Sequence, residues 1–180
     1  LRHLLDTNFA GRITDAQWPI ELAFLTEGAL ALGDRDAALV LRPFLALYTG
    51  MNLAGGQLVA MFGSADRYLA QVDTLLGDGD SAERHFAAAL AMDRQMGSVV
   101  HVAETLAAHA LALHATDPAR ARALAAQARA LAEPIGQVRV LRSLERLACL
   151  AGPAPLKPRR PSRSTATAAE THMIGTIGST

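Results

Sequence analysis

Six polar and aromatic side chains recur at helical spacing in two segments of the chain. They combine a guanidinium, a phenol, an amide, a carboxylate and two imidazoles, all of which bind partners through hydrogen bonds or ion pairs. Each segment is expected to be the first helix of a helical hairpin, and first helices of stacked hairpins line the concave surface. The predicted groove for a partner or ligand consists of Arg67, Tyr68, Gln71, His101, Glu104 and His109. An ordinary solvated face is the alternative.

The histidines do not have the spacing of a metal site. His109 and His114 are five residues apart and share a helix face poorly. His101 and Glu104 are three apart on one face, but a zinc site needs more than two protein ligands. We therefore predict no metal site.

Other short patterns also have simple structural interpretations. The run Asp78-Gly79-Asp80 lacks the twelve-residue ligand pattern of a calcium loop, so a tight turn with Asp80 as the next N-cap is expected. Cys149 lies among leucines with no base nearby in sequence, which predicts a small buried thiol. Because no G-x-x-x-x-G-K-[ST] run occurs, ATP binding is not assigned. No catalytic residue or cofactor is predicted, and the chain is not expected to be an enzyme.

The composition predicts an all-α protein. Hydrophobic residues make up 51% of the chain and aromatic residues only 4%, so alanine and leucine, both good helix formers, supply the core. Residues 1–151 contain 13 arginines and 16 acidic residues. This part therefore has no clustered basic surface, and no nucleic-acid contact is expected of it. No apolar run is long enough for a membrane span. The single cysteine favours a reduced, cytoplasmic setting.

Punctuation by glycine, proline and capping residues divides the apolar pattern into about seven helices. Pro118 after Asp117, for example, is typical of a helix start, and Gly97 of a helix end. The glycine-rich stretch 49–63 is expected to be a loop, and residues 1–10 the end of an earlier helix. The expected helices are 15–32, 36–48, 64–76, 80–96, 101–114, 118–133 and 138–150.

We predict two regions of different character. Residues 1–151 form a helical-repeat domain, and residues 152–180, rich in proline, serine, threonine and arginine, form a disordered tail or linker. The tail contains four basic residues and one acidic residue, which fits a soluble linker better than a DNA contact.

Two of the predicted hairpins resemble each other. The segment Ala82–Ala89 aligns with Ala121–Ala128 at an offset of 39 residues, and a weaker copy starts at Ala37. Small residues at these positions let the second helix of a pair approach the first closely. One hairpin cannot bury its apolar face alone, so neighbouring hairpins must stack into an α-solenoid.

Ala82, Phe86 and Ala89 resemble the second-helix signature of the tetratricopeptide repeat. The first-helix positions are degenerate, since Ala70 and Asp73 stand where glycine and tyrosine are usual. Over about residues 1–150, the runs Leu32-Gly33-Asp34, Phe62 to Leu69 and Ala82 to Leu90 are similar to the helical-repeat sensor region of large bacterial ATP-dependent regulators.

That resemblance implies a non-catalytic binding module of a bacterial signalling or transcriptional regulator. Such regions also occur behind class III nucleotide cyclase domains and ahead of LuxR-type DNA-binding domains. The implied partners are a protein or small-molecule effector in the groove, and the ATPase and output domains of a longer parent protein. A stand-alone tetratricopeptide adaptor and the repeat region of a cyclase stay open as alternatives. The chain begins with Leu1, and both a fragment and a complete protein stay open.

Overall fold

A computed structural model describes residues 16–55 and 60–150 of the chain. Within these residues the fold is all-α, with seven helices and one short β-hairpin. The expected early helix at 1–10 and the tail at 152–180 lie outside the described residues. The elements are α2 (Trp18–Leu32), α3 (Arg35–Ala46), β1 (Asn52–Gly55), β2 (Ala60–Ser64), α4 (Ala65–Leu76), α5 (Gly79–Gln95), α6 (Val99–Leu113), α7 (Pro118–Ala132) and α8 (Val138–Leu150).

Side-chain caps explain where most helices begin. Asp117 accepts a hydrogen bond from the Arg120 amide and is followed by proline, as expected. The expected N-cap at Asp80 is wrong, because Asp78 accepts the amide of Ser81 at 3.0 Å and α5 starts one residue after it. Helix α6 likewise begins at Val99, two residues before the predicted start, because Ser98 caps it.

The stretch 49–63 was expected to be a loop, but it contains most of an antiparallel β-hairpin. Strand β1 pairs with β2 with Ala54 opposite Met61, and side chains of β1 alternate between half-buried and buried. Gly55 makes this packing possible, since a Cβ there would lie 2.0 Å from the Ile20 side chain on α2. The glycines of this stretch led to the prediction of a loop, although Gly55 lies in a strand and allows it to pack closely on α2.

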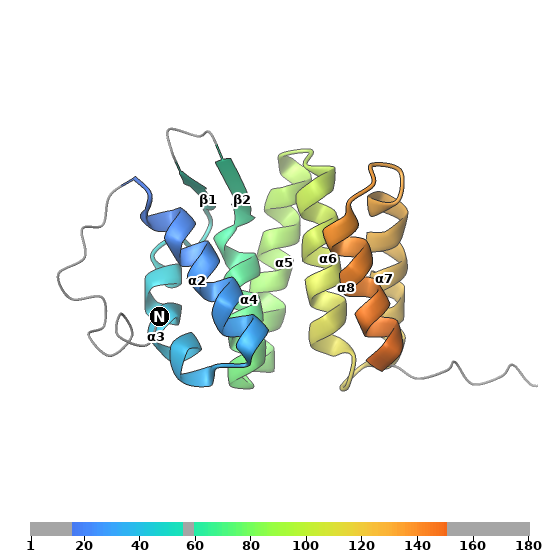
Figure 1. Cartoon of the computed structure of the whole chain (residues 1–180), viewed down its shortest axis with the longest axis horizontal. Helices are drawn as coiled ribbons and strands as arrows, with labels where there is room; N and C mark the ends of the chain where they lie inside the picture. Colours follow the sequence, from blue (N-terminus) through green and yellow to red (C-terminus); the bar gives the residue numbers. More distant parts are fainter. Residues whose placement is uncertain (1–15, 56–59, 151–180) are drawn as a thin grey trace, which may run out of the picture.

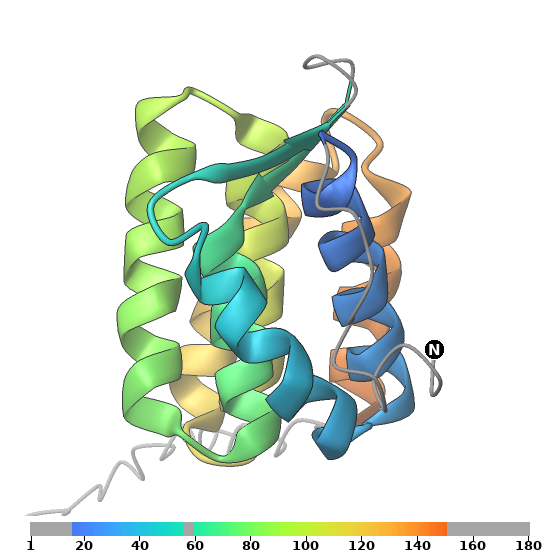
Figure 2. The same cartoon turned by 90° about the vertical axis from the view of Figure 1, so that its left-hand side faces the viewer.

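The helices form a row in which each packs on the next. In addition α2 contacts α4, α4 contacts α6, and α6 contacts α8, whereas the described parts of α3, α5 and α7 make no comparable contacts with one another. The set α2, α4, α6 and α8 therefore forms the closely packed side of the row, which we call the inner face. Figure 1 shows α2 and α8 in front, with α4 and α6 behind them, and Figure 2 shows the same row from its α3 end.

The repeat predicted from the sequence coincides with equivalent buried positions. Ala82, Phe86 and Ala89 are buried on α5, and Ala121 and Ala128, which align with two of them, are buried on α7. The corresponding residues of α3, Ala37 and Leu41, are also fully buried. Each second helix thus uses small side chains to approach its partner, as the spacing indicates.

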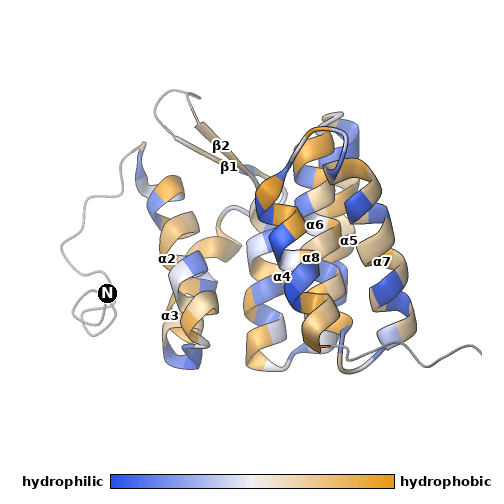
Figure 3. Cartoon of the chain, turned by 45° about the vertical axis from the view of Figure 1, so that its right-hand side comes forward, coloured by the Kyte–Doolittle hydropathy of each residue, from blue (hydrophilic) through white to orange (hydrophobic). Residues whose placement is uncertain are grey.

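Two apolar cores and a smaller joining cluster hold the row together. One core lies among α2, α3, β1 and α4, and the other among α5, α6, α7 and α8. Phe86, 1% exposed, lies in the joining cluster between α4, α5 and α6, and Leu124 is half-buried against the second core. Figure 3 shows hydrophobic segments along α2 and α3, where Leu32 and Leu39 face solvent.

The last helix corrects the expectation for Cys149. Helix α8 buries Val140, Leu144 and Leu147, which form one stripe, and Cys149 lies outside that stripe and is exposed.

None of the described helices is long and apolar enough to cross a membrane.

Candidate binding face

Arg67 on α4 joins the β-hairpin to α6. Its Nη2 atom donates to the carbonyl oxygen of Phe62 at 2.5 Å and lies 3.2 Å from Glu104 Oε2. The side chain of Arg67 is only 6% exposed and that of Glu104 16%, so this is a largely buried ion pair. A pair of this kind fixes geometry, because each charge needs the other once water is excluded.

Tyr68 supports this arrangement from inside the fold. Its hydroxyl donates to the carbonyl oxygen of Phe62 at 3.2 Å, and the Arg67 guanidinium lies 4.6 Å from the centre of its ring. Tyr68 is 1% exposed, and burial raises the pKa of its phenol. Tyr68 therefore belongs to the core beneath the predicted groove and does not line it.

Glu104 is the acidic centre of the cluster. His101 Nδ1 lies 3.4 Å from Glu104 Oε2, and the Gln137 amide donates to Oε1 at 3.5 Å. Burial pushes the pKa of Glu104 upward, but the hydrogen bond from His101 and the charge of Arg67 outweigh burial and lower it. The carboxylate is consequently ionised at neutral pH and holds α4, α6 and the start of α8 together.

Gly63 lets the hairpin approach this cluster. Its φ of +84° lies in the left-handed region, and a Cβ there would be 3.0 Å from His101 Nδ1 and 3.3 Å from Arg67 Nη2. Strand β2 is thus placed so that its carbonyl at Phe62 reaches Arg67.

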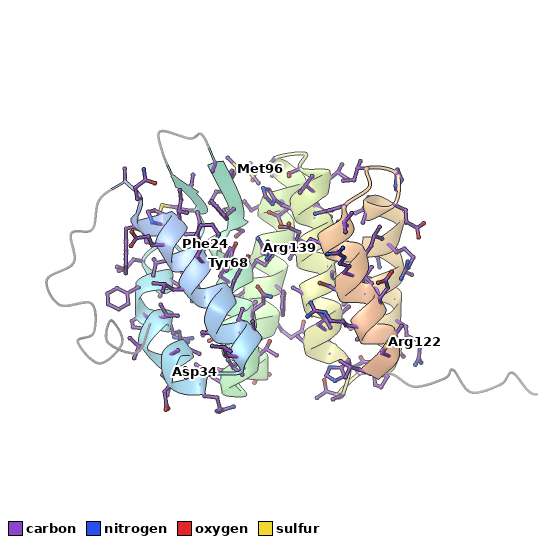
Figure 4. All side chains as sticks on the ribbon, in the orientation of Figure 1. Phe24, Asp34, Tyr68, Met96, Arg122 and Arg139 are labelled. Carbon is purple, nitrogen blue, oxygen red and sulfur yellow. The ribbon has the colours of Figure 1, made fainter. Side chains whose placement is uncertain are left out.

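A small pocket of about 80 Å³ lies on the inner face beside the Arg67–Glu104 pair. Gln71 of α4 lines it, as do Arg139 and Ser143 of α8. Arg139 also reaches across to Glu27 on α2, forming an ion pair between the first and last helices of the inner row. The hydrogen bond to Glu27 raises the pKa of Arg139. In Figure 4, Arg139 lies on the side of α8 toward α6, whereas Arg122 lies at the outer edge of the molecule.

The structure divides the six predicted groove residues. Arg67, Gln71 and Glu104 line the inner pocket, and His101 contacts Glu104 without lining the pocket itself. His109 lies elsewhere, because it stacks on Phe86 of α5 at 4.4 Å and its Nε2 is 2.9 Å from Glu83 Oε1. Glu104 and His109 are five residues apart on α6, about one and a half turns, so their side chains point to different faces of the helix.

Sequence reasoning missed Glu27, Arg139 and Ser143. Glu27 and Arg139 are 112 residues apart, so no local spacing relates them. The sequence does place these residues on first helices of hairpins. Because stacking brings all first helices to one face, that position could have indicated that they lie together.

Comparisons of this chain with protein-family models, with curated proteins and with solved structures give no match. Its function therefore has to be inferred from the geometry of the inner face.

Proposed function

We propose that this chain is a non-catalytic binding module, the helical-repeat region of a bacterial signalling or transcriptional regulator, and that its inner face receives the effector. The observation that supports the proposal is the convergence of polar side chains from four sequence-distant helices on one face. Glu27, Arg67, Glu104 and Arg139 alternate in charge across it. Alternating fixed charges select a partner by complementarity.

The size of the inner pocket favours a protein partner over a small molecule. Its volume of about 80 Å³ is far below the roughly 300–1,000 Å³ of pockets that enclose ligands. It suits one side chain of a partner that lies across α4, α6 and α8. Exposed Phe24, one turn before Glu27 on α2, packs edge-on against Phe62 with ring centres 5.2 Å apart and offers an apolar side chain to the same partner.

In this proposal the bound partner changes the packing of the inner helices. The Glu27–Arg139 ion pair joins α2 to α8, so a partner that competes for either charge alters how the two ends of the row approach. An adaptor or a cyclase-linked region would use the same face, and the attached domains distinguish these alternatives. The isolated chain is expected to show no ATP hydrolysis.

Selection of peptides from a random library tests the proposal. Selected peptides should bind the wild-type chain and lose at least tenfold in affinity for Ser143→Trp, which fills the inner pocket on α8. The matched control is Gln127→Trp, also a helical position, which is exposed on α7. Peptides that bind both variants equally, or a library that yields no specific binder, would count against an inner-face binding module.

A further inference from the structure

A second, larger pocket of about 370 Å³ lies between the α4–α5 turn and the last turns of α6. It touches α6 at His109 and Leu113, whereas the inner pocket touches α6 at Glu104 and Leu111. These pairs of positions lie on different faces of the helix, so the two pockets are separate. The volume falls within the roughly 300–1,000 Å³ of small-molecule sites.

The walls of this second pocket are largely apolar. The rings of Phe86 and His109 stack with an interplanar angle of 10°, and both residues line the pocket. Ala82 and Ala112 stand where larger residues would fill the space between α5 and α6. The pocket therefore has room for an apolar body of about one ring beside a flat aromatic pair.

Its charged groups are all acidic. Asp80 and Glu83 line the pocket, and no lysine or arginine does. Arg120 donates two hydrogen bonds of 2.9 and 2.8 Å to Glu83. Burial raises the pKa of Glu83, but the hydrogen bonds from Arg120 and His109 outweigh burial and lower it. Asp80 is exposed and has no ion pair within the described part of the chain, so its carboxylate is free to meet a ligand.

His109 and Thr74 add no free donor to the wall. His109 Nε2 is engaged by Glu83 Oε1 at 2.9 Å and its Nδ1 is buried, so neither imidazole nitrogen is open to a ligand. The hydroxyl of Thr74 already donates to the carbonyl oxygen of Ala70 at 2.7 Å, which leaves its lone pairs to accept. A ligand here meets acceptors and carboxylates, and finds no cation to pair with.

We propose that this pocket binds a small organic cation, a primary ammonium attached to an apolar body of about one ring. The ammonium supplies the positive charge for Asp80, which has no ion pair within the described residues, and the ring fills the space beside Phe86. Carboxylates and phosphates are disfavoured because the Asp80 carboxylate lines the wall and no lysine or arginine does. The site is independent of partner binding at the inner face.

Nuclear magnetic resonance titration of the full chain tests this assignment with three probes of matched shape. The ammonium probe is phenethylamine, the neutral probe 2-phenylethanol and the anionic probe 3-phenylpropionate. Phenethylamine should shift the amide signals of Gly79 and Ala112 saturably and bind at least threefold more tightly than the alcohol, while the propionate should not saturate. Equal affinity for all three probes, or shifts confined to other residues, would overturn the proposal.

Variants locate the site independently. Ala112→Leu should fill the pocket and Thr116→Trp should block its rim, each reducing phenethylamine affinity at least tenfold. Thr116 is exposed, so Thr116→Trp still tests the site if Ala112→Leu fails to fold.

Asp80→Asn should reduce the preference for the ammonium over the alcohol by about threefold, as expected for an exposed carboxylate. The control is Gly28→Ala on α2, where a Cβ meets nothing within 4 Å; unchanged binding in both pocket variants would refute the site.

Discussion

Replacing Arg67 with methionine should be among the most damaging single changes to the inner face. Methionine keeps a long apolar stem but removes the guanidinium that joins the Phe62 carbonyl, the Tyr68 hydroxyl and Glu104. Glu104 would then retain a largely buried carboxylate without its cation. Loss of one partner of a buried pair costs about 3–5 kcal/mol. Because His101 still contacts Glu104, we expect about 3 kcal/mol.

Glu104→Gln should cost less, because Arg67 keeps its two oxygen acceptors in β2 and α4. We expect a loss of about 2 kcal/mol, the scale of a lost hydrogen bond to a charged group. The double variant should lose about 3.5 kcal/mol, which corresponds to a coupling of about 1.5 kcal/mol between the two side chains.

Urea unfolding followed by far-ultraviolet circular dichroism at neutral pH measures all four free energies of unfolding. Arg122→Met on α7 is the control, since Arg122 is exposed and should change stability by less than about 0.5 kcal/mol. A coupling within about 0.3 kcal/mol of zero would show that the pair does not hold α4 to α6, and the description of the inner face would be wrong.

Three further outcomes are expected. Asp78→Ala should lower the free energy of unfolding by about 1 kcal/mol, because it removes the cap of α5, whereas Asp80→Ala should change it by less than about 0.5 kcal/mol; urea unfolding compares the two. Gly63→Ala should destabilise by about 1–3 kcal/mol, because φ is +84° and the new Cβ crowds the cluster, and thermal melting measures this loss. The lowered pKa of Glu104 means that its contribution to stability is present above the unfolded value of 4.5 and is lost as pH falls through the folded value. Unfolding at a series of pH values should therefore show a smaller acid loss in Glu104→Gln than in the wild type, and equal pH profiles would contradict the assignment.

The helices were predictable because local signals set them. The segments 64–76 and 138–150 were predicted to within a residue of α4 and α8, since capping and glycine residues act within a few positions. The sequence could not show whether Asp78 or Asp80 is the N-cap of α5. Both lie within about one turn of the first apolar residues of the helix, and aspartate is a good N-cap at either position. Only the backbone geometry of the turn decides which carboxylate reaches an amide.

The hairpin and the inner face depended on contacts that sequence spacing does not encode. Gly55 and Gly63 look like loop residues, yet they permit close packing against Ile20 and His101. The cluster of Arg67 with Glu104 was anticipated as a set of neighbouring polar groups, but its buried pairing was not. Ion pairs across many residues depend on how the hairpins stack, and that stacking is a property of the whole apolar pattern.

The approach of α2 to α8 across the inner face is most directly tested by cross-linking. Cysteines at Glu27 and Arg139, introduced with Cys149→Ser, should be joined within one chain by a short bismaleimide, because the native side chains form an ion pair. Cysteines at positions 27 and 122 should not be joined, since residue 122 lies on the outer side of α7. If the 27–139 pair cross-linked no faster than the 27–122 pair, the two ends of the inner row would not meet, and the binding face described above would not exist.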